Sequence, residues 1–390
     1  MFKILMLFIF ARPFIASLAF PCLNLIYSIG FMGVLIAVFF HNKVSFNRIE
    51  SVKYPLILFC FALLISVAFS VNPLNSFKEL YKYLSGLLLF TIASSLSYKD
   101  AERVVKAVIF SGCLVCLLAV YQYFISFQNL SIYLAQIKNP THLMQAYILN
   151  KRVFFPFITP NTLASYLIMI ISLVLPFKNN IWFISLFFIT LIFTKSLGGF
   201  ISILLVLGLY FYFSERVTKQ KIFLLLGVYF SLIIIFFLRA GSQEYAQPIL
   251  STSNRLQYWQ DTLALIKSSP LLGAGLGNFN IAGVLYAHNT YLQIWAEMGF
   301  LGIISWLWLV ILALVKGTRL YRNYMAAYKS VKIPGYPDYM FPGLISAVVV
   351  FLIHNIIDFS FFLPEVSLIW WLIFGLLFAE KKHVSDKDTL

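Results

Sequence analysis

The sequence predicts an all-α, polytopic integral membrane protein with about twelve transmembrane helices. Of its 390 residues, 61% are hydrophobic and only 11% are charged, whereas roughly a quarter of the residues in a soluble domain are charged. The apolar residues form repeated, uninterrupted runs of about 17–20 residues, the length a helix needs to cross the hydrocarbon core of a bilayer. A transmembrane β-barrel would show short alternating segments instead.

Each apolar run is expected to form one span, and the first is expected to be retained because no small-residue cleavage site follows it. The expected spans are residues 4–20, 23–41, 54–71, 79–97, 104–125, 161–177, 180–195, 197–213, 221–238, 290–316, 341–357 and 363–380. Residues 1–380 then make a single transmembrane domain and residues 381–390 a cytoplasmic tail. Three connecting segments exceed the usual loop length: residues 126–160, 239–289 and 317–340.

The formal net charge of +15 is explained by membrane topology and not by nucleic-acid binding. With the N-terminus inside, most of the basic residues fall on the cytoplasmic side, as the positive-inside rule requires. This orientation places residues 126–160 and 239–289 outside the membrane and residues 317–340 inside.

The outer loop 239–289, which precedes the tenth span, is the most promising place for function, because long loops on compact proteins are often functional. An amphipathic surface helix is expected in it, capped by Ser253 or Asn254 and ended by Pro270. Its apolar residues recur at helical spacing: Leu256, Trp259, Leu263 and Ile266. The following "PLLGAGLGNF", which includes Gly275, lacks the spacing of a dinucleotide-binding motif. It predicts a tight loop entering the bundle, with exposed amides for an anion as the alternative.

His288 lies where this loop meets the tenth span, so its ring can be exposed to water on one side and buried on the other. A histidine there can accept a proton near neutral pH, but a helix-capping or interfacial role fits its position equally well. On a helix beginning here, Trp295, Gly299 and Gly302 share the His288 face, and the glycines allow close helix approach.

Four cations on the outer side need an explanation, because the positive-inside rule disfavours them: Arg152, Lys195, Arg239 and Arg255. Converging cations can hold a diphosphate and stabilise it as a leaving group, although each could instead reach lipid phosphates. His354 and Asp358, spaced i,i+4 near the outer end of the eleventh span, predict a polar pair with either a functional or a structural role. The sequence contains no metal-binding motif and implies no cofactor.

Three segments of the sequence together resemble the bacterial O-antigen ligase family. "HNTYLQIWAEMGFLG" fits the family's pattern of His, then Asn, Ser or Gln, nine residues, Gly, two residues, and Gly, Thr or Tyr. "NRLQYWQDTLALIKSSPLLGAGLGNF" resembles the Arg…Trp…Pro-x-x-Gly-x-Gly segment of the wider O-antigen ligase and polymerase superfamily. "RVFFPFITPNTLASYL" resembles its Pro-Asn segment. The chain departs from the family at "KSLGG", where relatives often carry Ser-Arg-Gly and Lys195 could supply the cation.

The resemblance implies an inverting, metal-independent, lipid-linked glycosyltransferase of the bacterial inner membrane, with its active site facing the periplasm. Such an enzyme transfers polysaccharide from undecaprenyl diphosphate to a hydroxyl of lipid A-core. His288 would assist deprotonation of the acceptor, and Arg255, with Arg152, Lys195 or Arg239, would hold the departing diphosphate. Seven further residues are expected to have supporting roles: Asn289, Trp259, Gly275, Gly299, Gly302, His354 and Asp358.

Three alternatives remain open at this stage. An O-antigen polymerase would use the same donor with another lipid-linked glycan as the acceptor. A membrane transporter also commonly has twelve spans, but carriers usually show repeated halves and polar breaks at mid-membrane. A transferase acting on protein hydroxyls is the third.

Overall fold

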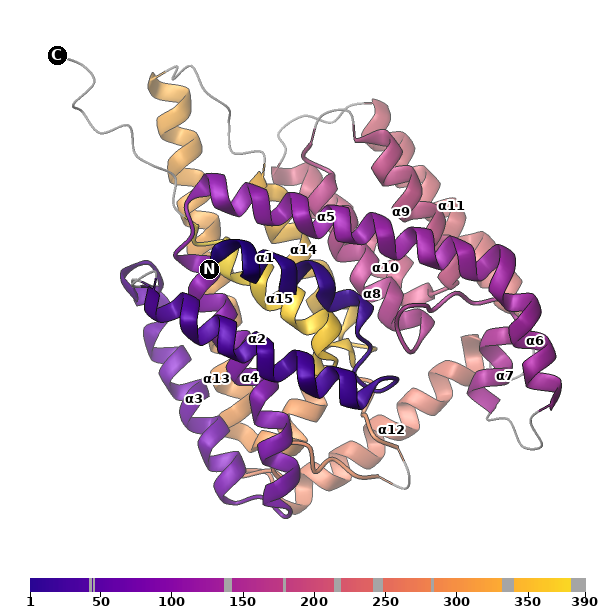
Figure 1. Cartoon of the computed structure of the whole chain (residues 1–390), viewed down its shortest axis with the longest axis horizontal. Helices are drawn as coiled ribbons and strands as arrows, with labels where there is room; N and C mark the ends of the chain where they lie inside the picture. Colours follow the sequence, from indigo (N-terminus) through magenta and orange to yellow (C-terminus); the bar gives the residue numbers. More distant parts are fainter. Residues whose placement is uncertain are drawn as a thin grey trace.

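The protein is α-helical throughout the part that the computed structural model describes, which is residues 1–41, 44, 46–136, 142–177, 180–213, 219–240, 248–281, 284–331 and 340–379. Its helices are shown in Figure 1. They are α1 (Phe2–Ala11), α2 (Pro21–His41), α3 (Lys53–Ala68), α4 (Pro73–Ser94), α5 (Tyr98–Tyr121), α6 (Phe127–Gln136), α7 (His142–Leu149), α8 (Pro160–Val174), α9 (Ile181–Thr194), α10 (Leu197–Phe213), α11 (Lys219–Ala240), α12 (Pro248–Ser268), α13 (Thr290–Val331), α14 (Met340–His354) and α15 (Pro364–Leu376).

Several of these helices are long and apolar enough to cross a membrane. By length and composition they are Pro21–His41, Asn47–Ala68, Tyr98–Gln136 and Thr290–Asn323. Shorter apolar helices occur at Pro160–Val174, Ile181–Thr194, Leu197–Gly208, Leu225–Ala240, Met340–His354 and Pro364–Leu376. Each of the expected spans overlaps a helix, so the all-α, multi-helix membrane architecture is confirmed, while the number of twelve crossings stays a prediction.

The first apolar run does not form one continuous helix, contrary to expectation. Helix α1 ends at Ala11, and a short 3₁₀ turn, Arg12–Phe14, follows it. Pro13 has no backbone N–H to donate and its ring opposes the preceding turn, so the helix cannot continue regularly through it. The expected outer loop at residues 126–160 also differs, because it contains α6 and α7.

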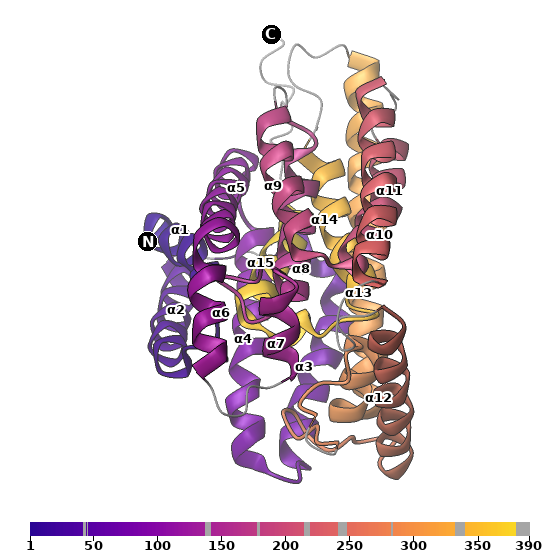
Figure 2. The same cartoon turned by 90° about the vertical axis from the view of Figure 1, so that its right-hand side faces the viewer.

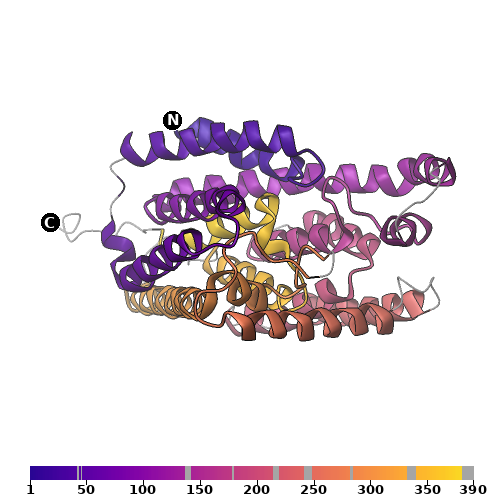
Figure 3. The ribbon, with the colours of Figure 1, turned by 90° about the horizontal axis from the view of Figure 1, so that it is seen from below.

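Helices α14 and α15 lie at the centre of the fold. Almost every side chain of both helices is buried. Helix α15 packs against α4, and α14 packs against α8 and α10. Figure 3 shows these yellow helices enclosed between α1 and α2 on one side and the layer of α12 and α13 on the other.

The outside of the bundle carries large exposed apolar side chains, as lipid contact requires. Ile26, Phe40, Trp182 and Phe223 are each 69–82% exposed. A soluble monomer rarely exposes apolar surface on this scale, which agrees with an integral membrane protein.

Helix α12 lies at the opposite end of the molecule from the last turns of α13 (Figures 1 and 2). Those last turns carry Lys316, Arg319 and Arg322. A basic helix end is typical of the cytoplasmic side, so this arrangement agrees with the expected position of α12 on the outer side.

Candidate active site

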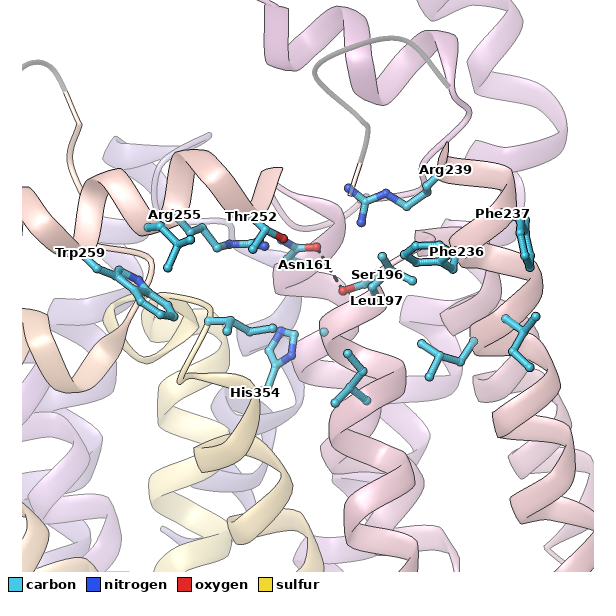
Figure 4. A pocket seen from close by; sticks show the side chains of 16 residues that line it. Asn161, Ser196, Leu197, Phe236, Phe237, Arg239, Thr252, Arg255, Trp259 and His354 are labelled. Carbon is cyan, nitrogen blue, oxygen red and sulfur yellow. Dashed lines mark hydrogen bonds between the residues drawn. The ribbon is translucent and has the colours of Figure 1, made fainter. Parts of the chain in front are cut away.

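A cavity of about 530 Å³ lies where α12 approaches the ends of α8, α10, α11 and α14. Figure 4 shows the side chains around it. Its polar lining residues are Asn161, Ser196, Arg239, Thr252, Arg255 and His354, with the indole of Trp259 beside them. One wall is apolar and is formed by Leu232, Ile233, Phe236 and Phe237 of α11. The cavity thus joins a cationic rim to an apolar wall.

Two of the four predicted cations line this cavity. Arg255 projects from α12 and Arg239 from the last turn of α11. Burial lowers the pKa of Arg255, with Asp358 acting in the opposite direction. An arginine keeps its charge through a shift of this kind, so the rim stays cationic and suits an anionic ligand.

Arg152 lies directly behind the cavity and holds one of its lining residues in place. Its Nη2 donates to Oδ1 of Asn161 at 3.2 Å and its Nε to the carbonyl of Thr194 at 3.1 Å. The same Asn161 oxygen accepts a hydrogen bond from Ser196 Oγ at 3.1 Å. Burial lowers the pKa of Arg152 to about 10, so it remains charged at neutral pH. Arg152 therefore adds positive charge to the site without lining it.

Lys195 is not among the residues that line the cavity. It ends α9 in a left-handed conformation, with φ 50°, and its Nζ donates to the carbonyl of Asn150 at 2.7 Å. The geometry therefore does not favour the predicted contact between Lys195 and a diphosphate.

His288 lies beside this cavity, half-buried between two aromatic rings. Its ring stacks on Tyr258, with the centroids 5.7 Å apart, and meets Phe359 edge-on at 4.8 Å. Its Nδ1 is buried without a hydrogen-bond partner, and its backbone has φ +51°. A non-glycine residue in this conformation is strained, and such strain is common at functional sites.

The electrostatic surroundings of His288 favour a neutral imidazole. Burial and the nearby Arg255 guanidinium lower the pKa of His288 from 6.5 to about 4, while Asp358 opposes the shift. His288 is therefore free to accept a proton at neutral pH, and the charge of Arg255 adds to burial in weakening it as a base.

Asn289 caps α13, so the helix-capping interpretation of His288 is wrong. Its Oδ1 accepts hydrogen bonds from the backbone N–H groups of Tyr291, at 3.0 Å, and Leu292, at 3.1 Å. These amides lack a partner within the helix, and an asparagine at this position satisfies them. The supporting role expected of Asn289 is thus a structural one.

Helix α12 confirms the expected surface helix, but its start was predicted wrongly. It begins at Pro248, not at Ser253 or Asn254. Proline suits the first turn of a helix, where its missing N–H would have no partner. The helix ends at Ser268, just before Pro270, as predicted. Trp259 and Leu256 line the cavity, and Ile266 packs against Phe279 and Ala287.

The glycine-rich loop after α12 inserts its backbone into a break in α13. Gly299 has φ 67° and ψ −170°, which interrupts the helix. A Cβ there would lie 2.0 Å from the carbonyl oxygen of Leu271. Phe300 N donates to the carbonyl of Pro270 at 2.9 Å, and Gly275 N donates to the carbonyl of Glu297 at 2.9 Å. The loop backbone thus supplies hydrogen-bond partners to helix groups at the break.

This loop corrects two expectations. The prediction of a continuous helix from His288 through Gly302 is wrong, since Gly299 closely approaches the loop instead of another helix and Gly302 contacts Met298 of its own helix. The tight loop is confirmed, with φ +95° at Gly275. The amides of its three glycines are not free for an anion, because Gly273 N donates to the carbonyl of Ser269 and Gly275 N and Gly277 N donate to Glu297.

The predicted pair of His354 and Asp358 is present beside the cavity. His354 Nε2 lies 3.6 Å from Asp358 Oδ2, and Asp358 also accepts a hydrogen bond from Ser360. Both side chains are 1% exposed, and neither ring nitrogen of His354 has a hydrogen-bond partner. His354 thus places an imidazole in the cavity wall, whereas His288 lies beside the cavity and is not one of its lining residues.

Sequence reasoning missed five residues of this site: Asn161, Ser196, Thr252, Tyr258 and Phe359. Asn161 stood in a quoted motif but received no role. Tyr258 and Phe359, which enclose the His288 ring, gave no signal in the sequence beyond the position of Tyr258 next to Trp259. In the described ranges, no group of three or more His, Cys, Asp or Glu residues could hold a metal ion.

The fold and the site together define a class of protein: a polytopic membrane protein with a cationic, half-apolar cavity beside a strained histidine. Residues 182–307 match the family model described as O-Antigen ligase, which confirms the resemblance over that segment. Members of this family transfer lipid-linked glycans, as ligases or polymerases. The matched segment runs from α9 into α13 and includes Lys195, Arg239, Arg255 and His288. No curated protein matches the chain.

Proposed function

We propose that this protein is an O-antigen ligase of the bacterial inner membrane. It transfers polysaccharide from undecaprenyl diphosphate to a hydroxyl of lipid A-core on the periplasmic side. One observation carries the proposal: Arg239 and Arg255 converge on a cavity with an apolar wall, and the neutral ring of His288 lies beside it. A donor that joins a diphosphate to a long isoprenoid requires both kinds of surface.

The proposed reaction is a single displacement with inversion. The acceptor hydroxyl oxygen attacks the anomeric carbon of the donor sugar, and the bond from that carbon to the diphosphate oxygen breaks. The electron pair leaves on the diphosphate, where Arg255 and Arg239 stabilise the charge. The hydroxyl proton moves to His288, which acts as general base. Arg152 supports the site through Asn161.

Donor binding strengthens this base. In the free protein, the Arg255 charge helps to hold the pKa of His288 near 4. The diphosphate brings negative charge next to Arg255 and offsets its effect, so the pKa of His288 rises toward its ordinary value. His288 therefore becomes a stronger base when the leaving group is in place.

The pH dependence of kcat/KM tests this electrostatic arrangement. Because kcat/KM reports the free enzyme, its acidic limb is expected near pH 4, and activity should stay level from about pH 5 to 8. A profile measured with purified protein in liposomes checks this. Half-maximal activity near pH 6.5, the value of an ordinary histidine, would show that His288 is not held neutral by its surroundings.

Deletion of the gene tests the function in cells. Lipopolysaccharide from the deletion strain is expected to carry free core with no attached polysaccharide, and the wild-type gene should restore attachment. A strain that instead attaches shortened glycan to the core would identify a polymerase.

Complementation of the deletion strain with Arg255→Lys is expected to restore attachment only weakly, because lysine cannot contact a diphosphate through a planar fork.

A further inference from the structure

A chain of three hydrogen bonds connects the glycine-rich loop to the backbone next to His288. Gly277 N donates to Glu297 Oε2 at 3.1 Å. Gln293 Nε2 donates to Glu297 Oε1 at 2.9 Å, and Ala287 N donates to Gln293 Oε1 at 3.0 Å. Glu297 and Gln293 are 3% and 1% exposed and Ala287 is fully buried. The hydrogen bonds are therefore shielded from water from Glu297 to Ala287, while the Gly277 end is partly buried.

The direction of each hydrogen bond in this chain is determined by its two ends. Both ends are backbone N–H groups, which can only donate. The Gln293 amide must turn its oxygen to Ala287, so its nitrogen faces residue 297. Only a side chain with two acceptor oxygens can then serve both Gln293 and Gly277 at once, and a carboxylate is that group.

The Ala287 end of the chain bears directly on the strained residue. Ala287 precedes His288, whose φ of +51° must be held by the surrounding structure. On the other side of His288, Asn289 caps α13, and Thr290 N donates to the carbonyl of Asn355 at 3.0 Å. The Tyr286–Ala287 peptide, which lies one residue before the peptide bond to His288, is held by Gln293. Loss of the Gln293 contact would leave the buried Ala287 N–H without its partner and release one side of the strained turn.

We propose that Gln293 and Glu297 are positioning residues that fix the His288 imidazole against the cavity through the hydrogen bond to Ala287 N. This inference rests on the proposed role of His288 as the base. Neither side chain touches the cavity, so both act through the backbone. Displacement of a catalytic group by about 1 Å can cost about 10²-fold in rate, and the effect falls on kcat.

Exchanging Gln293 and Glu297 tests this chain of hydrogen bonds. In Glu297→Gln the amide cannot accept from both Gln293 and Gly277, and in Gln293→Glu two acceptor groups face each other. The double variant Gln293→Glu/Glu297→Gln restores every pair: Glu at 293 accepts from Ala287 N and from the new amide, whose oxygen accepts from Gly277 N. Each single change is expected to lower kcat by about tenfold or more with the donor KM nearly unchanged, and the double change to recover most of it.

Ser66→Ala is the matched control, because Ser66 Oγ donates to the backbone carbonyl of Glu297 at 2.9 Å but takes no part in the chain. It should lower the melting temperature in detergent while kcat stays near that of the wild type. If Glu297→Gln does not accumulate in the membrane, Gln293→Met, which leaves the Glu297 bond to Gly277 in place, gives the same comparison.

Two results would overturn the inference: single variants with wild-type kcat, or a double variant no more active than the weaker single one. A parallel His288→Ala sample separates the two claims. If His288→Ala remains active, the proposed role of His288 as the base fails, and this inference fails with it, whereas the proposed function is tested separately by gene deletion. If only His288→Ala is inactive, the base assignment stands and the positioning role is lost.

Discussion

Replacing His288 with alanine is expected to lower kcat for glycan transfer by about 10²–10⁴-fold, the usual contribution of a general base. The acceptor hydroxyl would then lose the group that takes its proton, while Arg239 and Arg255 would still hold the diphosphate. Donor binding is therefore expected to persist. Initial rates with purified protein in liposomes, measured over a range of donor concentrations, separate kcat from KM.

His41→Ala is a suitable control for this variant. His41 ends α2, is exposed and lies far along the chain from the cavity, so its removal should leave the rate unchanged. A His288→Ala protein that turns over at the wild-type rate would remove His288 from the chemistry. A variant that loses donor binding and keeps kcat would give it a binding role instead.

Changing Gly299 to alanine is expected to cost about 4 kcal/mol or more of stability, the range reached when strain and a steric clash combine. The residue has φ +67°, and a Cβ would lie 2.0 Å from Leu271 O and 2.3 Å from Leu271 C. Both are backbone atoms, so no side-chain rotation relieves the contact. The inserted loop would be pushed out of the break in α13. The hydrogen bonds from Phe300 N to the carbonyl of Pro270 and from Gly275 N to the carbonyl of Glu297 would then be lost.

Thermal unfolding in detergent and the yield of folded protein check this prediction. Gly33→Ala in α2 is the control, because a Cβ at Gly33 meets nothing within 4 Å, and alanine should be neutral or slightly stabilising there. A Gly299→Ala protein with a wild-type melting temperature would show that the break in α13 is not required.

Much of the fold could be predicted because hydropathy and proline leave clear signals. The surface helix α12 was expected from its apolar spacing, and Pro270 correctly marked its end. Its start was missed because a polar residue that can cap a helix can equally lie inside one. The break at Gly299 was missed for a different reason. It depends on a loop packing against the helix backbone, and a continuous apolar run gives no sign of that contact.

The site was predictable where single residues were out of place and unpredictable where distant segments meet. Arg239 and Arg255 were identified because cations are disfavoured outside, and both line the cavity. Lys195 met the same criterion, yet its amine contacts Asn150. Phe359 packs against His288 across 71 positions of the chain, a separation over which no local pattern gives information.

The most direct test of the central claim is to identify the product made by purified protein in liposomes that contain undecaprenyl diphosphate-linked polysaccharide and lipid A-core. The expected product is polysaccharide joined to lipid A-core with inverted anomeric configuration, and one undecaprenyl diphosphate released per transfer. Polysaccharide that grows only on the polyprenyl carrier, or a donor that remains intact, would contradict it.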